Sequence, residues 1–333
     1  MNTWGHQLRL SIFGESHGPA IGIVVDGLPA GERIDFDAVA AEMKRRAPGQ
    51  DETATARREG DEAEILSGLP NSHTTGAPLC AIIRNRDTRS SDYDAKLRPG
   101  HADWTALLKF KGHADMRGGG HFSGRLTAPL VFAGAIAKQI LARRGVQVKG
   151  RIVRVGQTEV ADLFRDEILK AKAAGDSVGG IVQATAIGVP GGLGEPFFAS
   201  LESVVASLMF SIPAVRGVEF GDGFALAALR GSQANDQLYL DGHRIRAKTN
   251  HNGGVLGGIT NGEAIVVRAA IKPTPSIAKT QRTVDAGTMT ETELSIGGRH
   301  DPCIVPRALP VIEAALALSL LDCWLCNGWG TGC

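Results

Sequence analysis

Glycine residues punctuate the whole chain and constrain its fold more than any other feature. There are 43 of them among 333 residues, nearly double the usual share of roughly 7%, and they follow no collagen-like period. Because glycine adopts backbone conformations that other residues avoid, we expect many tight turns and close approach of backbone to a ligand. The densest run, residues 118–120, is followed by His121, Ser123 and Arg125, groups that can hold an anion or move a proton.

The segments between the glycines alternate between strand-like and helix-like patterns. Strands are predicted, from alternating or continuous apolar residues, at 21–29, 60–69, 76–85, 146–156, 179–190 and 262–273. Helices are predicted, from helical spacing and capping signals, at 35–46, 130–145, 162–176, 201–213 and, after its prolines, 306–325. Because no linker separates these segments, we predict a single domain over residues 1–326 and a short, flexible tail over residues 327–333.

The composition disfavours several classes of function. With 36 Lys and Arg against 35 Asp and Glu, the chain lacks the basic excess of a nucleic-acid binder. The N-terminus has no signal-peptide pattern, and the most apolar late stretch, residues 314–321, is too short to span a bilayer. Five cysteines with irregular spacing are poor evidence for a disulfide framework, so Cys323 and Cys326 are interpreted as small apolar residues of the last helix. We therefore expect a cytoplasmic protein that binds neither nucleic acid nor a membrane.

Histidines lie in three loops that contain glycine or proline. His17 follows Ser16 in GESHG, His101 lies in RPGHAD, and Asp301 follows His300 in GRHDPC. Such loops can fix a side chain at the rim of a scaffold, and histidine titrates near neutral pH, which suits general acid catalysis. The alternative is that each histidine only satisfies the backbone of its own turn. Three such loops in one chain favour a chemical role for at least some of them.

Arginines gather in loops of the same kind. Arg46 lies shortly before a Pro-Gly pair, and Arg125 and Arg299 each follow a glycine. Because a guanidinium binds phosphate and carboxylate groups through paired hydrogen bonds, this grouping predicts a small, multiply anionic ligand. The alternative, exposed solubilising charge, applies to residues such as Arg165. Phosphate-loop, Rossmann, nucleophile-elbow and metal-ligand motifs are missing, so a conventional kinase, dehydrogenase or zinc hydrolase is disfavoured and no metal is expected.

Taken together, the motifs resemble those of the chorismate synthase family. The matching pieces, which follow the family's order and cover nearly the whole chain, are FGESHG at 13, RRAPGQ at 45, RPGHAD at 98, RGGG at 117, GLGEP at 192, AVRGVEFGDGF at 214, TNHNGGVLGGITNG at 249, KPT at 272 and GRHDPC at 298. The resemblance implies an α+β fold, a sandwich in which helices lie between two antiparallel sheets, with two similar halves. It also implies a homotetramer.

The reaction implied by the resemblance is the trans-1,4-elimination of phosphate from 5-enolpyruvylshikimate 3-phosphate to give chorismate. This is a carbon–oxygen lyase reaction, the last common step of the shikimate pathway. It depends on reduced FMN although substrate and product differ by no net redox change, and NADPH is a candidate reductant. Two alternatives are a catalytically impaired homologue that binds FMN or anions, and a flavin reductase that uses NADPH.

The resemblance also assigns roles to individual residues. His17 is similar to the family's histidine near the substrate phosphate, His101 to the histidine near the flavin, and Asp301 to the aspartate that relays a proton at flavin N5. The residues implied to bind substrate are Ser16, Arg46, Ser123, Arg125 and Arg299. The residues implied to bind FMN are His121, Phe122, Ser123, Gly257, Lys272, Pro273, Thr274, Pro275, Ser276 and Arg299, and Arg46 is implied to bind NADPH.

The chain departs from the family pattern beside the triple glycine. Where the family usually has GGGRSSARET, this chain has GGGHFSGRLT, so His121, Phe122 and Leu126 replace an arginine, a serine and a glutamate. In addition, Pro275 replaces a serine, and Glu52 stands where a basic residue is common. His121 is therefore interpreted as a weaker stand-in for an arginine, charged only when it is protonated.

Overall fold

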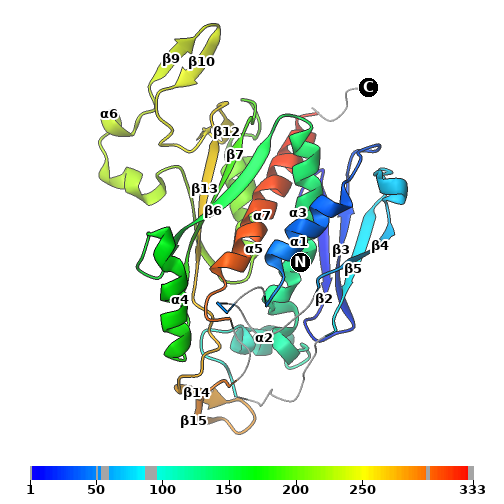
Figure 1. Cartoon of the computed structure of the whole chain (residues 1–333), viewed down its shortest axis with the longest axis vertical. Coiled ribbons are helices and arrows are strands. Elements are labelled where there is room, and N and C mark those ends of the chain that lie inside the picture. Colours follow the sequence, from blue (N-terminus) through cyan, green and yellow to red (C-terminus); the bar gives the residue numbers. More distant parts are fainter. Residues whose placement is uncertain (1, 50–51, 54–59, 87–95, 298–300, 329–333) are drawn as a thin grey trace.

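The computed structural model describes residues 2–49, 52–53, 60–86, 96–297 and 301–328, and two antiparallel sheets form its outer layers (Figure 1). The first sheet has the strand order β1-β2-β3-β5-β4 and consists of β1 (Thr3–Trp4), β2 (Arg9–Gly14), β3 (Ala20–Asp26), β5 (Leu79–Arg84) and β4 (Ala63–Ser67). The second has the order β6-β7-β13-β8 and consists of β6 (Gln147–Val155), β7 (Gly180–Ile187), β13 (Ile265–Ile271) and β8 (Val215–Phe220).

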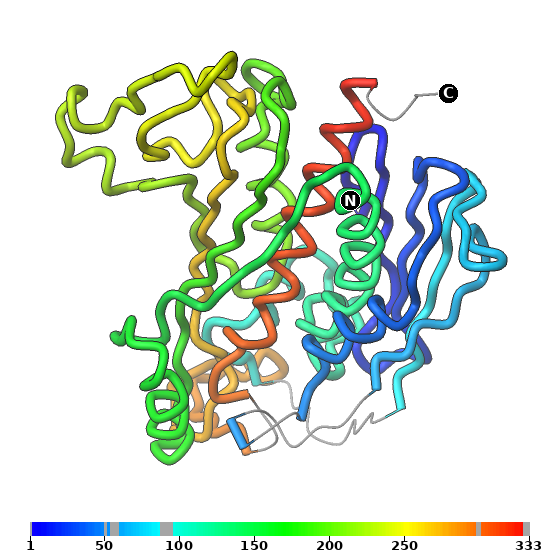
Figure 2. The backbone as a smooth tube through the Cα atoms, turned by 45° about the horizontal axis from the view of Figure 1, so that its top comes forward, coloured from blue at the N-terminus to red at the C-terminus, as the bar shows by residue number. Residues whose placement is uncertain are grey.

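Four helices fill the space between the two sheets (Figure 2). They are α1 (Phe36–Arg46), α3 (Thr127–Ala142), α5 (Leu201–Ser211) and α7 (Val305–Cys326). Helix α3 packs against the first sheet and against α7, and α7 packs against β6 and β7. Both helices are apolar around most of their circumference, as expected for helices enclosed on all sides. Strand β13 turns alternate residues, Ile265, Val267, Ala269 and Ile271, into this core.

The two halves of the chain repeat the same order of elements. In the first half, β2, β3, α1, β4, β5 and α3 follow one another; in the second, β6, β7, α5, β8, β13 and α7 do so, with smaller elements inserted. The strand orders correspond as well, because β2-β3-β5-β4 matches β6-β7-β13-β8. This confirms the predicted α+β sandwich with two similar halves.

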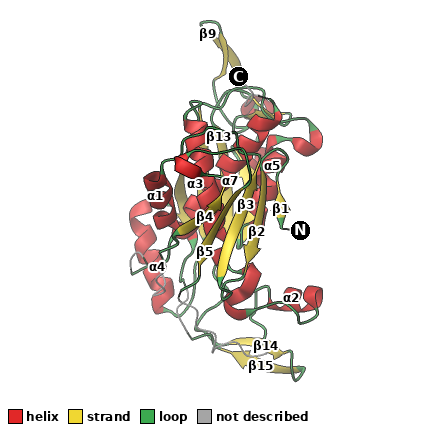
Figure 3. Cartoon of the chain, turned by 90° about the vertical axis from the view of Figure 1, so that its right-hand side faces the viewer, coloured by secondary structure: helices red, strands yellow, loops and turns green. Residues whose placement is uncertain are grey.

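The smaller elements extend from the two ends of the sandwich (Figure 3). At one end lie α2 (Asp103–Phe110) and the hairpin of β14 (Gln281–Asp285) and β15 (Thr290–Leu294). The opposite end carries α6 (Gly231–Ala234) and two further hairpins, β9 (Leu238–Asp241) with β10 (Arg244–Ala247), and β11 (Val255–Leu256) with β12 (Ile259–Thr260). Helix α4 (Phe164–Ala173) packs beside β6.

The predicted helices and strands are present, with some bounds shifted. Asp35 caps α1 as expected, its side chain accepting from the backbone of Asp37 and Ala38. Helix α3 begins at Thr127 rather than at 130. Helix α7 begins at Val305 and contains Pro310, so it starts before its prolines rather than after them. Residues 329–333, which make up most of the predicted tail, lie outside the described residues.

Two apolar helical stretches, one that joins the turns before α3 to α3 itself and one that is α7, have the length of a membrane span. Residues 117–142 and 305–326 are long and apolar enough to cross a membrane, by length and composition alone. However, 78% and 83% of their apolar windows are buried inside the protein. That burial is characteristic of core helices, so length alone does not make them membrane spans. Cys323 is buried on α7 and Cys326 is exposed, and both are free.

Candidate active site

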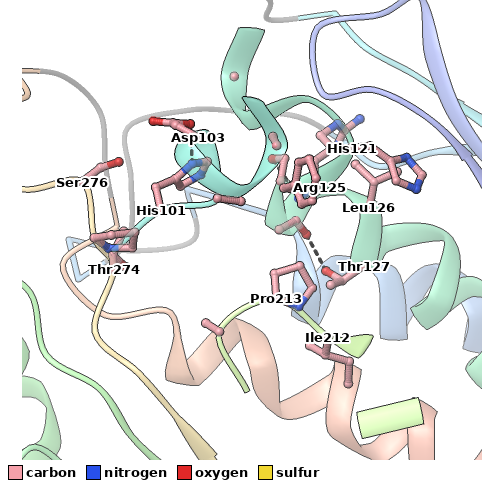
Figure 4. A pocket seen from close by; sticks show the side chains of 18 of the residues that line it. His101, Asp103, His121, Arg125, Leu126, Thr127, Ile212, Pro213, Thr274 and Ser276 are labelled. Carbon is pink, nitrogen blue, oxygen red and sulfur yellow. Dashed lines mark hydrogen bonds and ion pairs between the residues drawn. The ribbon is translucent and has the colours of Figure 1, made fainter. Parts of the chain in front are cut away.

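A cavity of about 1950 Å³ opens at the end of the sandwich that carries α2, and both halves of the chain line it. The predicted site residues that line it are His17, Arg46, His101, His121, Phe122, Ser123, Arg125, Lys272, Thr274, Pro275, Ser276 and Asp301. Figure 4 shows His101, Thr274 and Ser276 on one side of this cavity and His121 and Arg125 on another. The fold thus brings together residues that are as far apart in sequence as His17 and Asp301.

The triple glycine passes between two histidines. Gly118 has a φ of +61°, and a Cβ atom there would lie 2.4 Å from ring atoms of His17 and 3.0 Å from Oγ of Ser16. Gly119 has a φ of +85°, and its Cβ would lie 3.4 Å from Nε2 of His101 and 3.6 Å from Cβ of Ser123. Only glycine allows both the left-handed backbone and the close approach of the first imidazole. The glycine run therefore allows the ring of His17 to lie directly against this turn.

His101 is paired with a carboxylate. Its Nδ1 lies 2.7 Å from Oδ1 of Asp103, the first residue of α2. Arg98 binds the same carboxylate through Nε and Nη2, at 2.7 and 2.6 Å. Burial acts to raise the pKa of Asp103, but the hydrogen bonds from Arg98 and His101 outweigh it and hold that pKa well below its usual range.

Two buried arginines share one buried carboxylate. Nη1 of Arg46 donates to Oδ2 of Asp61 at 2.6 Å, and Nη1 of Arg125 donates to the other oxygen. The remaining donors of Arg46 reach the carbonyl oxygen of Gly124 at 2.8 Å and Oγ1 of Thr127 at 3.3 Å. Burial lowers the pKa of Arg46 to about 10, against the attraction of Asp61. Asp61 in turn has a lowered pKa, because both arginines outweigh the effect of its burial.

Asp301 is connected to this arginine cluster by Arg307. Nη1 of Arg307 donates to Oδ2 of Asp301, and its Nε donates to the backbone carbonyl of Arg46 at 3.1 Å. Arg307 lies in the first turn of α7 and lines the cavity. The start of α7 therefore links the predicted proton-moving carboxylate to the predicted anion-binding arginine.

The loop after β13 forms another wall of the cavity. Lys272 donates from Nζ to the carbonyl oxygen of Gly100, which joins this loop to the loop that carries His101. Oγ1 of Thr274 is buried and has no hydrogen-bond partner among the described residues. The same is true of Oγ of Ser16, a fully buried residue beside His17. Orphaned buried hydroxyls are uncommon in proteins and are satisfied by water or a ligand.

The departures beside the triple glycine have local partners. Nδ1 of His121 lies 2.8 Å from the carbonyl oxygen of Gly14. The ring of Phe122 meets that of Phe110 edge to face, with centroids 6.2 Å apart, and so packs against α2. Glu52 pairs with Arg165 of α4, away from the residues that line the cavity. Phe122 also lines the cavity, whereas Glu52 does not.

Not every predicted residue lines the cavity. Ser16 and Pro273 lie beside residues that do, but Gly257 lies in the turn between β11 and β12 and is not part of the lining. Arg299 lies outside the described residues. Among the residues that are described, no group of three or more His, Cys, Asp and Glu could hold a metal ion.

Three residues of the site, Asp61, Arg307 and Asp103, were not among those predicted from the motifs. Asp61 stands 15 residues after Arg46 and 64 before Arg125, and only the fold joins the three. Arg307 was also missed, although it follows GRHDPC closely. Asp103 belongs to the RPGHAD motif, and its position two residues after His101 was the available signal.

The fold and the cavity define a two-sheet α+β protein in which histidines and arginines from both halves meet at one large site. The chain belongs to the chorismate synthase family, whose model matches residues 8–325, and it is therefore an enzyme. It is 48% identical to the chorismate synthase of Thermococcus kodakarensis, with 96% of each chain covered. It is 49% identical to that of Archaeoglobus fulgidus, with 98% of each covered.

A solved structure supports the same assignment. A chorismate synthase crystal structure superposes with a TM-score of 0.73 at 28% identity, covering 97% of this chain and 93% of the other. The fold predicted from the motifs is thus that of the family.

Proposed function

We propose that this enzyme eliminates phosphate from 5-enolpyruvylshikimate 3-phosphate in a trans-1,4 sense to give chorismate, and so acts as a carbon–oxygen lyase in aromatic amino-acid biosynthesis. The observation that carries this proposal is the convergence of His17, His101, Arg46, Arg125 and Asp301 on one cavity in a member of this family. The substrate carries a phosphate and two carboxylates. Such a ligand matches a site supplied with guanidinium groups.

Reduced FMN is the cofactor that we propose, and the residues present fit it. The cavity is large enough for a flavin beside a small substrate, and its lining includes Gly118, which has no side chain to project into it. Ser16 and Thr274 offer buried hydroxyls without protein partners among the described residues. Lys272 is the cation that we assign to the cofactor phosphate. When bound, reduced FMN supplies electron density that helps the substrate's phosphate to leave.

The chain's own side chains bind the substrate and move protons. We assign Arg46 and Arg125 to substrate anions, with Asp61 fixing the direction of both guanidinium groups. His17 donates a proton to the departing phosphate, which lowers the charge on the leaving group. Asp301, oriented by Arg307, moves the proton that the substrate carbon loses.

The proposal is tested by an anaerobic assay with the enolpyruvyl substrate and chemically reduced FMN. Chorismate should form, and its absence under those conditions would overturn the proposal. An impaired homologue would bind FMN in the same experiment without making chorismate. A parallel assay with oxidised FMN and NADPH tests our further proposal that the enzyme can use NADPH as reductant; if chorismate forms only with chemically reduced FMN, an external reductase is the supplier.

We also propose that the enzyme is a cytoplasmic homotetramer. Large apolar side chains are exposed on the hairpin of β9 and β10, which projects from the sandwich (Figure 1), and on the short segments before α5 and after β8. They are Leu238, Leu240 and Ile245 on the hairpin and Phe197, Phe198 and Phe224 on the two segments, each at least 64% exposed. Exposed apolar surface of this kind is typical of protein interfaces. Gly257 does not line the cavity of its own chain. In the proposed tetramer, Gly257 would instead contact the flavin bound by a neighbouring copy.

A further inference from the structure

The imidazole of His101 is fixed by one specific hydrogen bond. Its Nδ1 lies 2.7 Å from Oδ1 of Asp103, and Figure 4 shows the two side chains facing each other across this contact. The side chains are 16% and 11% exposed, so water competes little for either group. The bond joins a residue of the RPGHAD loop to the first turn of α2, and it holds the ring plane in one orientation.

Asp103 is itself held as a carboxylate. Arg98 donates to it three times, from its backbone N–H and Nε to Oδ2 and from Nη2 to Oδ1, at 2.9, 2.7 and 2.6 Å. These bonds and the bond to His101 lower the pKa of Asp103 far below neutral pH. An ionised carboxylate can only accept a hydrogen bond. The proton in the contact with His101 therefore resides on Nδ1.

The other ring nitrogen is consequently directed at the glycine turn. The position that a Cβ of Gly119 would take is 3.4 Å from Nε2 of His101 and 3.6 Å from Cβ of Ser123. With its proton on Nδ1, a neutral His101 presents an acceptor at Nε2, and a protonated His101 presents a donor there. Within the part of the chain that the structure describes, the charged groups bonded to this loop are Arg98, Asp103 and Lys272, whose Nζ is bound to the carbonyl of Gly100.

We propose that Asp103 is a positioning residue that fixes the tautomer and orientation of His101, so that Nε2 faces the triple glycine and Ser123 in the cavity. The role of His101 in the reaction rests on the proposed function, but the tautomer does not. Arg98 contributes by keeping Asp103 ionised and in place. In Asp103→Asn, one of the two acceptor oxygens becomes an N–H donor, and the amide can favour the opposite tautomer of the ring.

The tautomer is measured directly by nitrogen NMR of the full-length protein labelled with 15N-histidine, with His101→Gln identifying the signals. In the wild type, we expect the proton of the neutral His101 ring on Nδ1 and none on Nε2. In Asp103→Asn, we expect the proton to move wholly or partly to Nε2. Asp222→Asn is the matched control, because Oδ2 of Asp222 lies 2.6 Å from Nδ1 of His251 in a second such pair; it should change the signals of His251 alone.

Kinetics test the functional consequence. Asp103→Asn should lower kcat at least tenfold and change the KM for the enolpyruvyl substrate less than twofold, while Glu159→Gln, which removes an exposed carboxylate paired with Arg154, should change neither. A wild-type ring with its proton on Nε2, or a variant with unchanged kcat, would overturn the proposal. The wild-type spectrum decides the tautomer even if Asp103→Asn does not fold. A wild type that makes no chorismate would refute the proposed function and leave the tautomer result standing.

Discussion

Nη1 of Arg46 and Oδ2 of Asp61 form a hydrogen-bonded ion pair of 2.6 Å, with side chains that are 3% and 0% exposed. Asp61 also accepts from Arg125, so one buried carboxylate sets the direction of two buried guanidinium groups. Such an arrangement is costly to desolvate, and here it lies beside the cavity that we propose binds the anionic substrate. Its value therefore lies in organising the site: it aligns two cations while cancelling part of their mutual repulsion.

Removing that carboxylate should destabilise the protein. Asp61→Asn leaves two buried guanidinium groups without their anion, and we expect the free energy of unfolding to fall by about 3 kcal/mol. Glu64→Gln is the control, because Glu64 forms an exposed pair with Arg84 and should change stability by less than about 1 kcal/mol. Urea unfolding measures both. Similar small losses in the two variants would contradict the organising role of Asp61.

The same variant gives a pH signature. The folded protein lowers the pKa of Asp61 below the usual 3.8, so the unfolded chain takes up a proton first as the pH falls. The stabilisation is therefore complete above about pH 5 and is lost as the pH falls through the folded-state value. The stability difference between wild type and Asp61→Asn should be full at about pH 7 and smaller at about pH 3. A difference that does not depend on pH would rule out this linkage.

A methyl group at Gly118 should damage the site selectively. In Gly118→Ala, the new Cβ would meet the ring of His17 at 2.4 Å on a left-handed backbone, so either the ring or the turn must move. We expect the rate of chorismate formation to fall at least tenfold. In Gly124→Ala, nothing lies within 4 Å of the new Cβ, and the melting temperature should stay close to that of the wild type. Full activity in Gly118→Ala would show that the position of His17 is not critical.

Lys272 should contribute to FMN affinity through its charge. We expect Lys272→Met to raise the dissociation constant for FMN about tenfold, equivalent to about 1.4 kcal/mol. Lys279→Met removes a cation that pairs with exposed Asp176 and does not line the cavity, and it should leave FMN affinity unchanged. Flavin fluorescence titration at low and high salt measures both, since an ionic contact weakens as salt rises. Equal affinities of wild type and Lys272→Met would remove Lys272 from the cofactor site.

The exposed apolar side chains on and around the β9–β10 hairpin and before α5, which include Phe198, should form the surface through which copies associate. Phe198 is 97% exposed, and Phe198→Asp places a charge where an interface must be apolar, so we expect smaller species in sedimentation velocity at micromolar protein. Leu66→Asp changes an exposed residue of β4 in the other sheet, and it should leave the assembly intact. A tetramer that survives Phe198→Asp, or a wild type that is monomeric, would contradict the proposed assembly.

The sequence predicted those parts of the fold that depend on local signals. The Asp35 cap marked the start of α1, and the alternating residues of β13 marked a strand with one buried face. Strand β2 was missed because RLSIFG is short and has only one fully buried residue, Leu10. The start of α3 at Thr127 was not predicted because Pro129 was taken to precede the helix. Proline is tolerated in the first turn of a helix, which is where Pro129 lies.

For the site, motifs predicted which residues meet but not how they are held. His17, His101, Arg46 and Arg125 all lie in glycine- or proline-containing segments that stand out in the sequence. Asp61 does not stand out, because its function follows from contacts with residues far along the chain. The spacing of His101 and Asp103 in RPGHAD is compatible with their pairing. The same spacing is equally compatible with Asp103 capping α2, so the motif alone did not predict the pair.

The central claim is most directly tested by one anaerobic single-turnover experiment with the enolpyruvyl substrate, reduced FMN and the wild-type enzyme. Released phosphate, chorismate and the visible absorbance of oxidised flavin are followed together. We expect one phosphate for each chorismate, while the flavin is reduced at the end as at the start. Absence of chorismate, or oxidation of flavin in proportion to the product formed, would contradict the proposed elimination.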